Sequence, residues 1–242
     1  MDTFISFIKS NYILLLKSLE VMAALTGLIL LKKYKQDKTA KFFIFFLFYV
    51  VLIETLGSYT LLIYKNKDYL DIYDTLKNTV FSKNYWWYSL VLAIGSSIFF
   101  SIYFYKVLRS RKLKTLVKYL AVPIICIQFF FYVYKFENFL SGNITEIRIL
   151  NLALVLIVTS IYFIELINSE AITNFYKSLP FYVATAAMMF FLIKTPVVFF
   201  EKYFNTSDQD YIALKYFISL FSILFMYLTY TIGLIMSKPE KS

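Results

Sequence analysis

One apolar stretch, residues 39–64, carries a single carboxylate near its middle, and that side chain is the first candidate for chemistry. A helix rises about 1.5 Å per residue, so about 20 apolar residues cross the hydrocarbon core of a bilayer. Counted from Lys41, Glu54 would lie roughly 20 Å into that core, far from either interface. A carboxylate at this depth is costly unless it is protonated, paired or facing water. Other helices must therefore shield Glu54, which is a candidate ligand- or proton-binding group.

A second carboxylate, Glu20, lies three residues after Lys17 in the first apolar segment, at nearly the same depth as Glu54. Residues three apart share a helix face, so Lys17 and Glu20 can pair. The functional interpretation is a polar cavity lined by Lys17, Glu20 and Glu54, open to the outside and able to hold a proton or a cationic ligand. The structural interpretation is that Lys17 neutralises Glu20, while Glu54 bonds to a Ser or Thr of a neighbouring helix. Gly-Ser-Ser at residues 95–97 and Ser101, in the third segment, could provide that partner.

The fifth apolar segment adds three polar residues. Arg148 and Asn151 lie three apart at its start, and so on one helix face, whereas Glu165 lies near its other end. All three are candidate ligand- or proton-binding groups. The structural alternative is that Arg148 and Glu165 extend to the nearest interface. The many Phe and Tyr side chains are expected to face lipid or form interfacial belts rather than line a binding site.

Residues that commonly serve catalysis or metal binding are scarce. The chain contains no histidine and a single cysteine, Cys126. The missing histidine removes the commonest metal ligand and the usual general base. The motifs GxxxxGK[ST], GxGxxG, GxSxG, CxxC and HExxH are also absent from the sequence. We therefore predict no metal site and no cofactor, and we do not favour an enzyme, although a lipid-modifying enzyme built on Glu20 and Glu54 remains an alternative.

Seven long apolar segments must position these side chains. The chain is 60% hydrophobic, whereas soluble domains have roughly 45–50% apolar residues. Runs of this length without strict alternation favour helices over strands. We therefore predict an all-α, polytopic membrane protein that forms one domain over residues 1–242. Its seven transmembrane helices are expected near residues 11–31, 40–64, 85–108, 113–134, 147–167, 175–200 and 211–236.

Two short basic loops predict the orientation of the chain. The basic residues that we expect to contact lipid or a partner are Lys32, Lys33, Lys35, Arg109, Arg111, Lys112 and Lys114. Because short basic loops stay in the cytoplasm, the N-terminus is expected outside and the C-terminus in the cytoplasm. The net charge of +10 therefore predicts binding to anionic inner-leaflet lipids or to an acidic cytoplasmic protein, and not to nucleic acid. Richness in Lys, Ile, Asn, Phe and Tyr is typical of AT-rich genomes, so we expect a bacterial cytoplasmic (inner) membrane.

Seven helices with this orientation resemble the N-terminal seven-helix sensory module of bacterial membrane histidine kinases. The resemblance extends over the whole chain, which carries neither an ATP-binding motif nor a histidine. It implies a stand-alone sensor or accessory subunit that signals through a separate partner. Microbial rhodopsins share the topology, but Lys215 lies at the outer edge of the last segment, which leaves no central lysine for a retinal Schiff base.

Two other functions remain open. A small proton-coupled transporter could use Glu20 and Glu54, although an odd number of helices and the lack of an inverted repeat count against it. A structural membrane scaffold without a ligand would require only the seven apolar segments.

Overall fold

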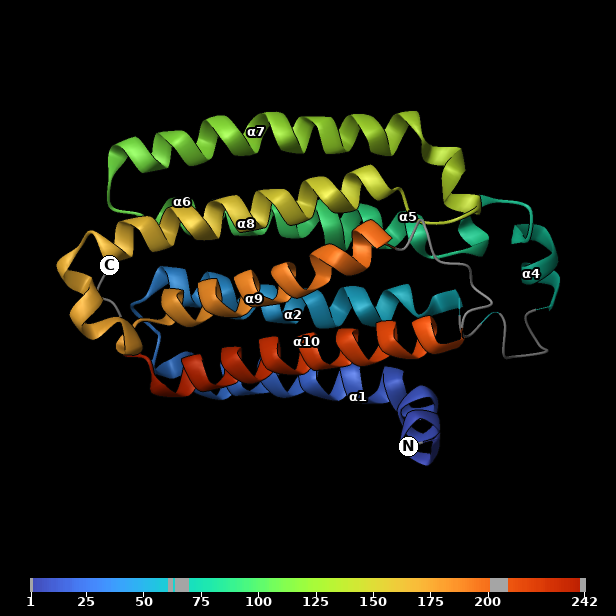
Figure 1. Cartoon of the computed structure of the whole chain (residues 1–242), viewed down its shortest axis with the longest axis horizontal. Helices are drawn as coiled ribbons and strands as arrows, with labels where there is room; N and C mark the ends of the chain where they lie inside the picture. Colours follow the sequence, from blue (N-terminus) through green and yellow to red (C-terminus); the bar gives the residue numbers. More distant parts are fainter. Residues whose placement is uncertain (1, 61–62, 64–69, 201–208, 240–242) are drawn as a thin grey trace.

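The computed structural model describes residues 2–60, 63, 70–200 and 209–239, and this part of the chain contains helices and no β-strand. The long helices run side by side (Figure 1), and they are α1 (Asp2–Ile29), α2 (Lys38–Gly57), α6 (Gly95–Val107), α7 (Arg111–Tyr134), α8 (Thr145–Ile167), α9 (Leu179–Phe200) and α10 (Gln209–Met236). Shorter elements are the 3-10 turns η1 (Leu30–Lys32), η3 (Val80–Ser82), η5 (Phe136–Leu140) and η6 (Glu170–Lys177), the helices α4 (Leu70–Leu76) and α5 (Tyr85–Trp87), and the π-helix η4 (Tyr88–Ile94). Within the described residues, seven helical stretches are long and apolar enough to cross a membrane, as the sequence predicts.

The helices close into a ring. Helix α1 packs against α2, α2 against α6, and α6 against α8. The ring continues from α8 to α9 and from α9 to α10, and it closes where α10 packs against α1. Helix α7 lies outside this ring, against α6 and α8, and forms one edge of the molecule (Figure 1). The N-terminus and the C-terminus lie at opposite ends of the bundle, and the connections before α2 and before α7 lie at the C-terminal end.

Several predicted helices differ from the structure. The first begins at Asp2, nine residues before its predicted start at residue 11. Helix α2 itself ends at Gly57, where the chain turns at Ser58. Residues 59, 60 and 63 are helical again, and residues 61, 62 and 64 lie outside the described part. The third span is not a uniform α-helix, since α5, the π-helix η4 and α6 follow one another within it. The sixth α-helix begins at Leu179 instead of residue 175, because the preceding residues form the 3-10 element η6.

An aromatic core fills the ring on its C-terminal side. Phe43 of α2 and Tyr103 and Phe104 of α6 are fully buried, and the ring of Phe43 meets that of Tyr230 at a centroid distance of 5.0 Å. Large apolar side chains on the outside stay exposed, for example Ile29 of α1 and Val133 of α7. Such an apolar exterior is expected where the surrounding solvent is lipid.

The last turn of α10 is fixed by the loop before α2. The Nζ of Lys33 donates hydrogen bonds to the carbonyl oxygens of Leu234 (3.0 Å) and Ile235 (2.8 Å). The hydroxyl of Tyr34 donates to the Leu234 oxygen at 2.8 Å and pairs with Ser237 Oγ at 2.6 Å. The final carbonyls of a helix lack intrahelical donors, so these side chains cap α10. Lys33, predicted as a lipid or partner contact, is thus engaged within the fold.

Candidate functional site

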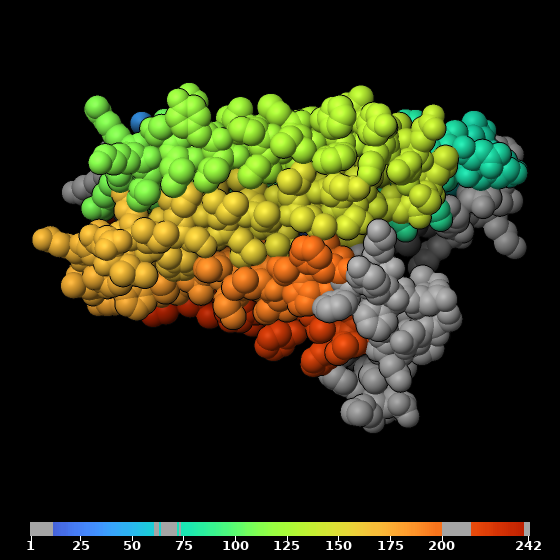
Figure 2. All heavy atoms as spheres, turned by 45° about the horizontal axis from the view of Figure 1, so that its top comes forward, coloured from blue at the N-terminus to red at the C-terminus, as the bar shows by residue number. Residues whose placement is uncertain are grey.

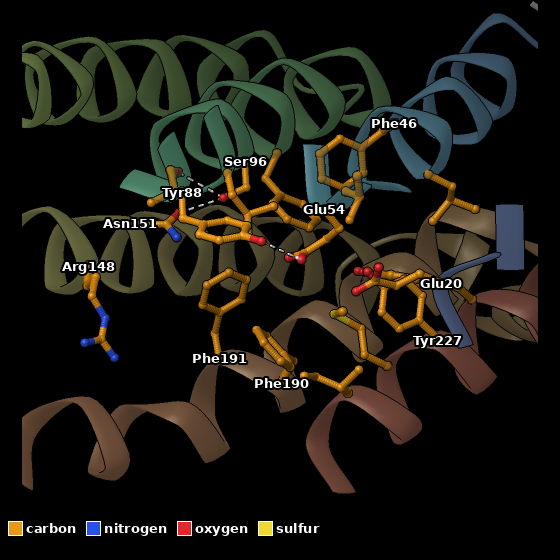
Figure 3. A pocket seen from close by; sticks show the side chains of 18 of the residues that line it. Glu20, Phe46, Glu54, Tyr88, Ser96, Arg148, Asn151, Phe190, Phe191 and Tyr227 are labelled. Carbon is orange, nitrogen blue, oxygen red and sulfur yellow. Dashed lines mark hydrogen bonds between the residues drawn. The ribbon is translucent and has the colours of Figure 1, made fainter. Parts of the chain in front are cut away.

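A cavity of about 350 Å³ lies inside the ring, and both predicted carboxylates line it. Its walls come from α1, α2, η4, α6, α8, α9 and α10, and Figure 3 shows Glu20 and Glu54 turned into it from different helices. Asn143, an exposed residue just before α8, also lines the cavity. The cavity therefore extends from the interior of the bundle to its N-terminal end.

Glu54 lies in the last turn of α2 and is half-buried. The hydroxyl of Tyr88 donates a hydrogen bond to its Oε2 at 3.0 Å (Figure 3). Gly57 permits this approach, because a Cβ there would lie 2.8 Å from the ring and hydroxyl of Tyr88. Next to it, the indole Nε1 of Trp87 donates to the Ile53 carbonyl at 3.1 Å and holds the two segments together. The predicted serine partner is therefore wrong: the third span supplies the partner, but it is a tyrosine.

Glu20 is buried, with 8% of its surface exposed, and makes no hydrogen bond or ion pair to any residue in the described part of the chain. The predicted pairing with Lys17 does not form. Instead the Lys17 Nζ donates to Ser58 Oγ at 2.7 Å, and that hydroxyl donates to the Glu54 carbonyl oxygen at 2.7 Å. Ser58 thus caps the end of α2 and Lys17 binds Ser58, so the Glu20 carboxylate is left facing the cavity.

The π-helix η4 brings Tyr88 to Glu54. A π-turn places an extra residue in a helical turn, and such turns are uncommon and often occur at functional sites. Tyr49 of α2 donates its hydroxyl to the Val91 carbonyl inside η4, at 2.5 Å. Gly95 follows directly, and a Cβ there would lie 2.5 Å from the Tyr49 hydroxyl. Gly95 is the one sequence signal for this close approach, although it does not by itself predict a π-helix.

Asn151 is held by a polar network that joins α6, α7 and α8. Its Oδ1 accepts hydrogen bonds from Ser97 Oγ (2.9 Å) and Ser96 Oγ (3.2 Å). The fully buried Gln128 of α7 donates through Nε2 to Ser97 Oγ at 3.0 Å and to the Ile147 carbonyl at 3.3 Å. The serines predicted for Glu54 therefore bind Asn151, which lines the cavity as a fixed side chain.

Arg148 lines the cavity one helical turn before Asn151. Figure 3 shows its guanidinium at the opposite end of the drawn site from Glu20, with Tyr88 and Phe191 between them. Glu54 lies three residues from the end of α2, and Arg148 lies three residues from the start of α8, so both belong to the same end of the bundle. The prediction that Glu54 lies near the middle of its span, far from either interface, is therefore wrong.

Aromatic side chains form much of the remaining wall, contrary to the expectation that they only face lipid. Figure 3 shows Phe46 of α2, Phe190 and Phe191 of α9, and Tyr227 of α10 around the two carboxylates. Aromatic faces attract cations through their ring quadrupole. A site that combines such faces with carboxylates can bind an organic cation, and sequence spacing did not reveal it because these residues come from three helices.

Glu165 does not join the cavity. Its carboxylate accepts hydrogen bonds from the backbone amides of Arg109 (3.0 and 3.1 Å) and Ser110 (2.6 Å), just before α7 begins. It therefore fixes the connection between α6 and α7 and acts as a structural residue. The side chains of Lys32, Lys35, Arg109, Arg111 and Lys112 are exposed, while the Lys114 Nζ lies 5.7 Å from the ring centroid of Tyr105. Among the described residues, no group of three or more potential metal ligands occurs.

Comparisons with protein-family models, with curated proteins and with solved structures found no match for this chain.

Proposed function

We propose that the protein is a seven-helix membrane receptor or sensory subunit whose ligand-binding site is the cavity around Glu20 and Glu54. The observation that carries this proposal is the buried Glu20 carboxylate, which faces an aromatic-walled cavity without a hydrogen bond from the described residues. A carboxylate in the membrane interior requires a proton, a cation or water. A small organic cation would supply the missing charge and would also contact the aromatic walls.

The aromatic core favours a ligand-binding site that opens at one end of the bundle, and not a transport pathway through it. Phe43, Tyr103 and Phe104 lie on the C-terminal side of the cavity, where they are fully buried. The cavity therefore opens toward one end of the bundle, as a sensor of one compartment requires.

The proposed orientation follows the distribution of basic residues. The exposed residues Lys32 and Lys35 precede α2, and the exposed residues Arg111 and Lys112 begin α7, at the same end of the bundle (Figure 1). Short basic loops favour the cytoplasm, so the cavity would face outward and the C-terminus inward, in a bacterial cytoplasmic membrane. The same residues would contact anionic lipids or an acidic signalling partner.

Binding can be measured through the two tryptophans of the chain, Trp86 and Trp87, because Trp87 bonds to the helix that carries Glu54. We would titrate the purified protein in lipid nanodiscs with phenethylamine, an arylalkyl cation, and record tryptophan fluorescence. We expect a saturable change that Glu20→Gln weakens by about tenfold, the effect of losing about 1.4 kcal/mol of binding free energy. Glu170→Gln, at an exposed position in η6, is the matched control and should bind as the wild type does.

Two results would refute the receptor assignment. If Glu20→Gln binds phenethylamine with the same affinity as the wild type, the cavity around Glu20 is not the binding site. Crosslinking in native membranes through Lys112 and Lys114 should recover a signalling protein in stoichiometric amount. If the chain is recovered alone, it has no partner through which it could signal.

A proton-coupled carrier is the second candidate, because Glu20 and Glu54 face one cavity and one of them has no hydrogen-bonding partner among the described residues. It predicts proton-driven uptake of the same cation into proteoliposomes. That uptake should disappear in Glu54→Gln, whereas saturable binding without uptake favours the receptor. Absence of both binding and uptake would leave a structural scaffold.

A further inference from the structure

A second cavity, of about 620 Å³, lies at the C-terminal end of the bundle. It is formed by the connection between α6 and α7, the end of α8, the element η6 and the segment after α10. Figure 1 places these segments at the end opposite α4, and Figure 2 shows η6 and the first turns of α7 at the same end of the surface. None of its lining residues is shared with the first cavity.

Three cationic side chains line this second cavity. Arg109 precedes α7, Lys177 ends η6, and Lys238 follows α10. A backbone hydrogen bond from the Lys238 amide to the Lys177 carbonyl, at 2.8 Å, holds the last two segments together. None of the three cations forms an ion pair with another residue in the described part of the chain. The Lys177 Nζ donates one hydrogen bond to Asn174 Oδ1 at 3.1 Å, which leaves two of its N–H groups, and no carboxylate neutralises any of the three charges.

Glu165 is the one acidic residue in the lining, and its oxygens are already occupied. They accept hydrogen bonds from the backbone amides of Arg109 and Ser110, so the carboxylate orders the connection that carries the Arg109 side chain. Three cations against one carboxylate leave the cavity with an excess of positive charge. The hydroxyls of Ser110 and Ser178 also line the cavity as hydrogen-bond donors. The Ser169 hydroxyl and the Asn168 amide line it too, but they already donate to backbone carbonyls at 2.9 and 2.7 Å.

An apolar surface adjoins this polar wall. Ile164 lines the cavity and is 54% exposed, and Ile167 beside it is 65% exposed. Lysine and arginine with neighbouring hydroxyl and amide donors are the groups that bind phosphate oxygens. Basic pockets between transmembrane helices bind acidic lipid headgroups in the same way.

We propose that this cavity binds a phosphate-bearing anion, either the headgroup of an acidic phospholipid or a soluble phosphate ester. The proposal depends neither on the ligand of the first cavity nor on the orientation of the chain. Arg109, Lys177 and Lys238 would contact the phosphate oxygens, and the exposed isoleucines would contact an acyl chain if the anion is a lipid.

Native mass spectrometry of the detergent-purified protein tests the proposal. The probes are phosphatidylglycerol, glycerol 3-phosphate and, as a neutral control, phosphatidylcholine. The test variant combines Arg109→Gln, Lys177→Gln and Lys238→Gln. The matched control combines Lys38→Gln, Lys106→Gln and Lys118→Gln, which remove the same charge from exposed positions outside the cavity.

We expect the cavity variant to bind the anionic probe at least about tenfold more weakly than the wild type, with less than a twofold change in the control variant. Tight binding of phosphatidylglycerol alone identifies a lipid site, and equal binding of glycerol 3-phosphate identifies a soluble phosphate. Two results would overturn the proposal: an equal loss of anionic-probe affinity in the cavity variant and the control variant, or binding of phosphatidylcholine as tight as that of phosphatidylglycerol. The first would mean diffuse electrostatic attraction, and the second would mean binding without recognition of the negative charge. If the triple variant does not fold, Lys238→Gln alone must weaken binding more than Lys118→Gln alone.

Discussion

The hydrogen bond between Tyr88 and Glu54 can be isolated by a double-mutant cycle. Tyr88→Phe removes the hydroxyl but keeps the ring that packs against Gly57. Glu54→Met keeps the length of the side chain and removes both oxygens. Because the two residues lie in direct contact, their combined effect on the free energy of unfolding should differ from the sum of the single effects.

The structure sets the expected coupling energy. One hydrogen bond of 3.0 Å joins the side chains, and interhelical hydrogen bonds in membrane proteins average about 0.6 kcal/mol. We would measure reversible unfolding in mixed micelles by steric trapping and expect a coupling of that size. Glu54→Gln provides the control, because its amide oxygen still accepts a hydrogen bond; Tyr88→Phe should cost the same in that background as in the wild type.

Two outcomes would refute this reasoning. A coupling near zero would mean that the hydroxyl of Tyr88 does not bond to Glu54. A coupling above about 1.5 kcal/mol, lost in the Glu54→Gln background, would mean that the bond depends on a charged carboxylate.

Two further predictions concern the packing of α10. Gly233→Ala should destabilise the fold by about 1–3 kcal/mol through overpacking, because a Cβ there would lie 2.5 Å from the Cβ of Tyr182; Gly142→Ala, with no atom within 4 Å, is the thermal-unfolding control and should be neutral. Tyr34→Phe should cost about 1–2 kcal/mol by removing its hydrogen bonds to the end of α10, whereas Tyr119→Phe, which is 73% exposed, should unfold as the wild type does. Burial raises the pKa of the Tyr34 hydroxyl, so its contribution to stability is complete below about pH 10 and declines as pH rises through the raised pKa. Above about pH 10 the free energy of unfolding should therefore fall more steeply in the wild type than in Tyr34→Phe. Equal slopes in the two proteins would contradict this.

The number of spanning helices could be predicted from the sequence because it depends on local composition. About 20 apolar residues in succession leave few alternatives in a bilayer. The end of α2 could not be predicted in the same way, since residues beyond Gly57 are as apolar as those before it. The turn there depends on Ser58 and its hydrogen bond from Lys17, which is 41 positions away in the chain.

The carboxylates of the site were predictable, but their partners were not. Glu20 and Glu54 are costly in lipid wherever their helices lie, so depth alone predicts that they face the interior. The partner of each depends on how the helices are rotated about their axes. The π-helix η4 changes that rotation for Tyr88, and the serines at 96 and 97 then face Asn151 instead of Glu54.

The two cavities are connected by one continuous element. Tyr88 at the start of η4 bonds to Glu54 in the first cavity, and α6 continues from η4 to Val107, which lines the second. Between them the helix packs through the buried aromatic rings of Phe99, Phe100 and Tyr103. Under the proposed function, a ligand that displaces Tyr88 from Glu54 can reach the opposite end only by moving this helix as a body. Glu165, which holds the backbone directly after α6, is therefore the residue at which such a movement would become visible.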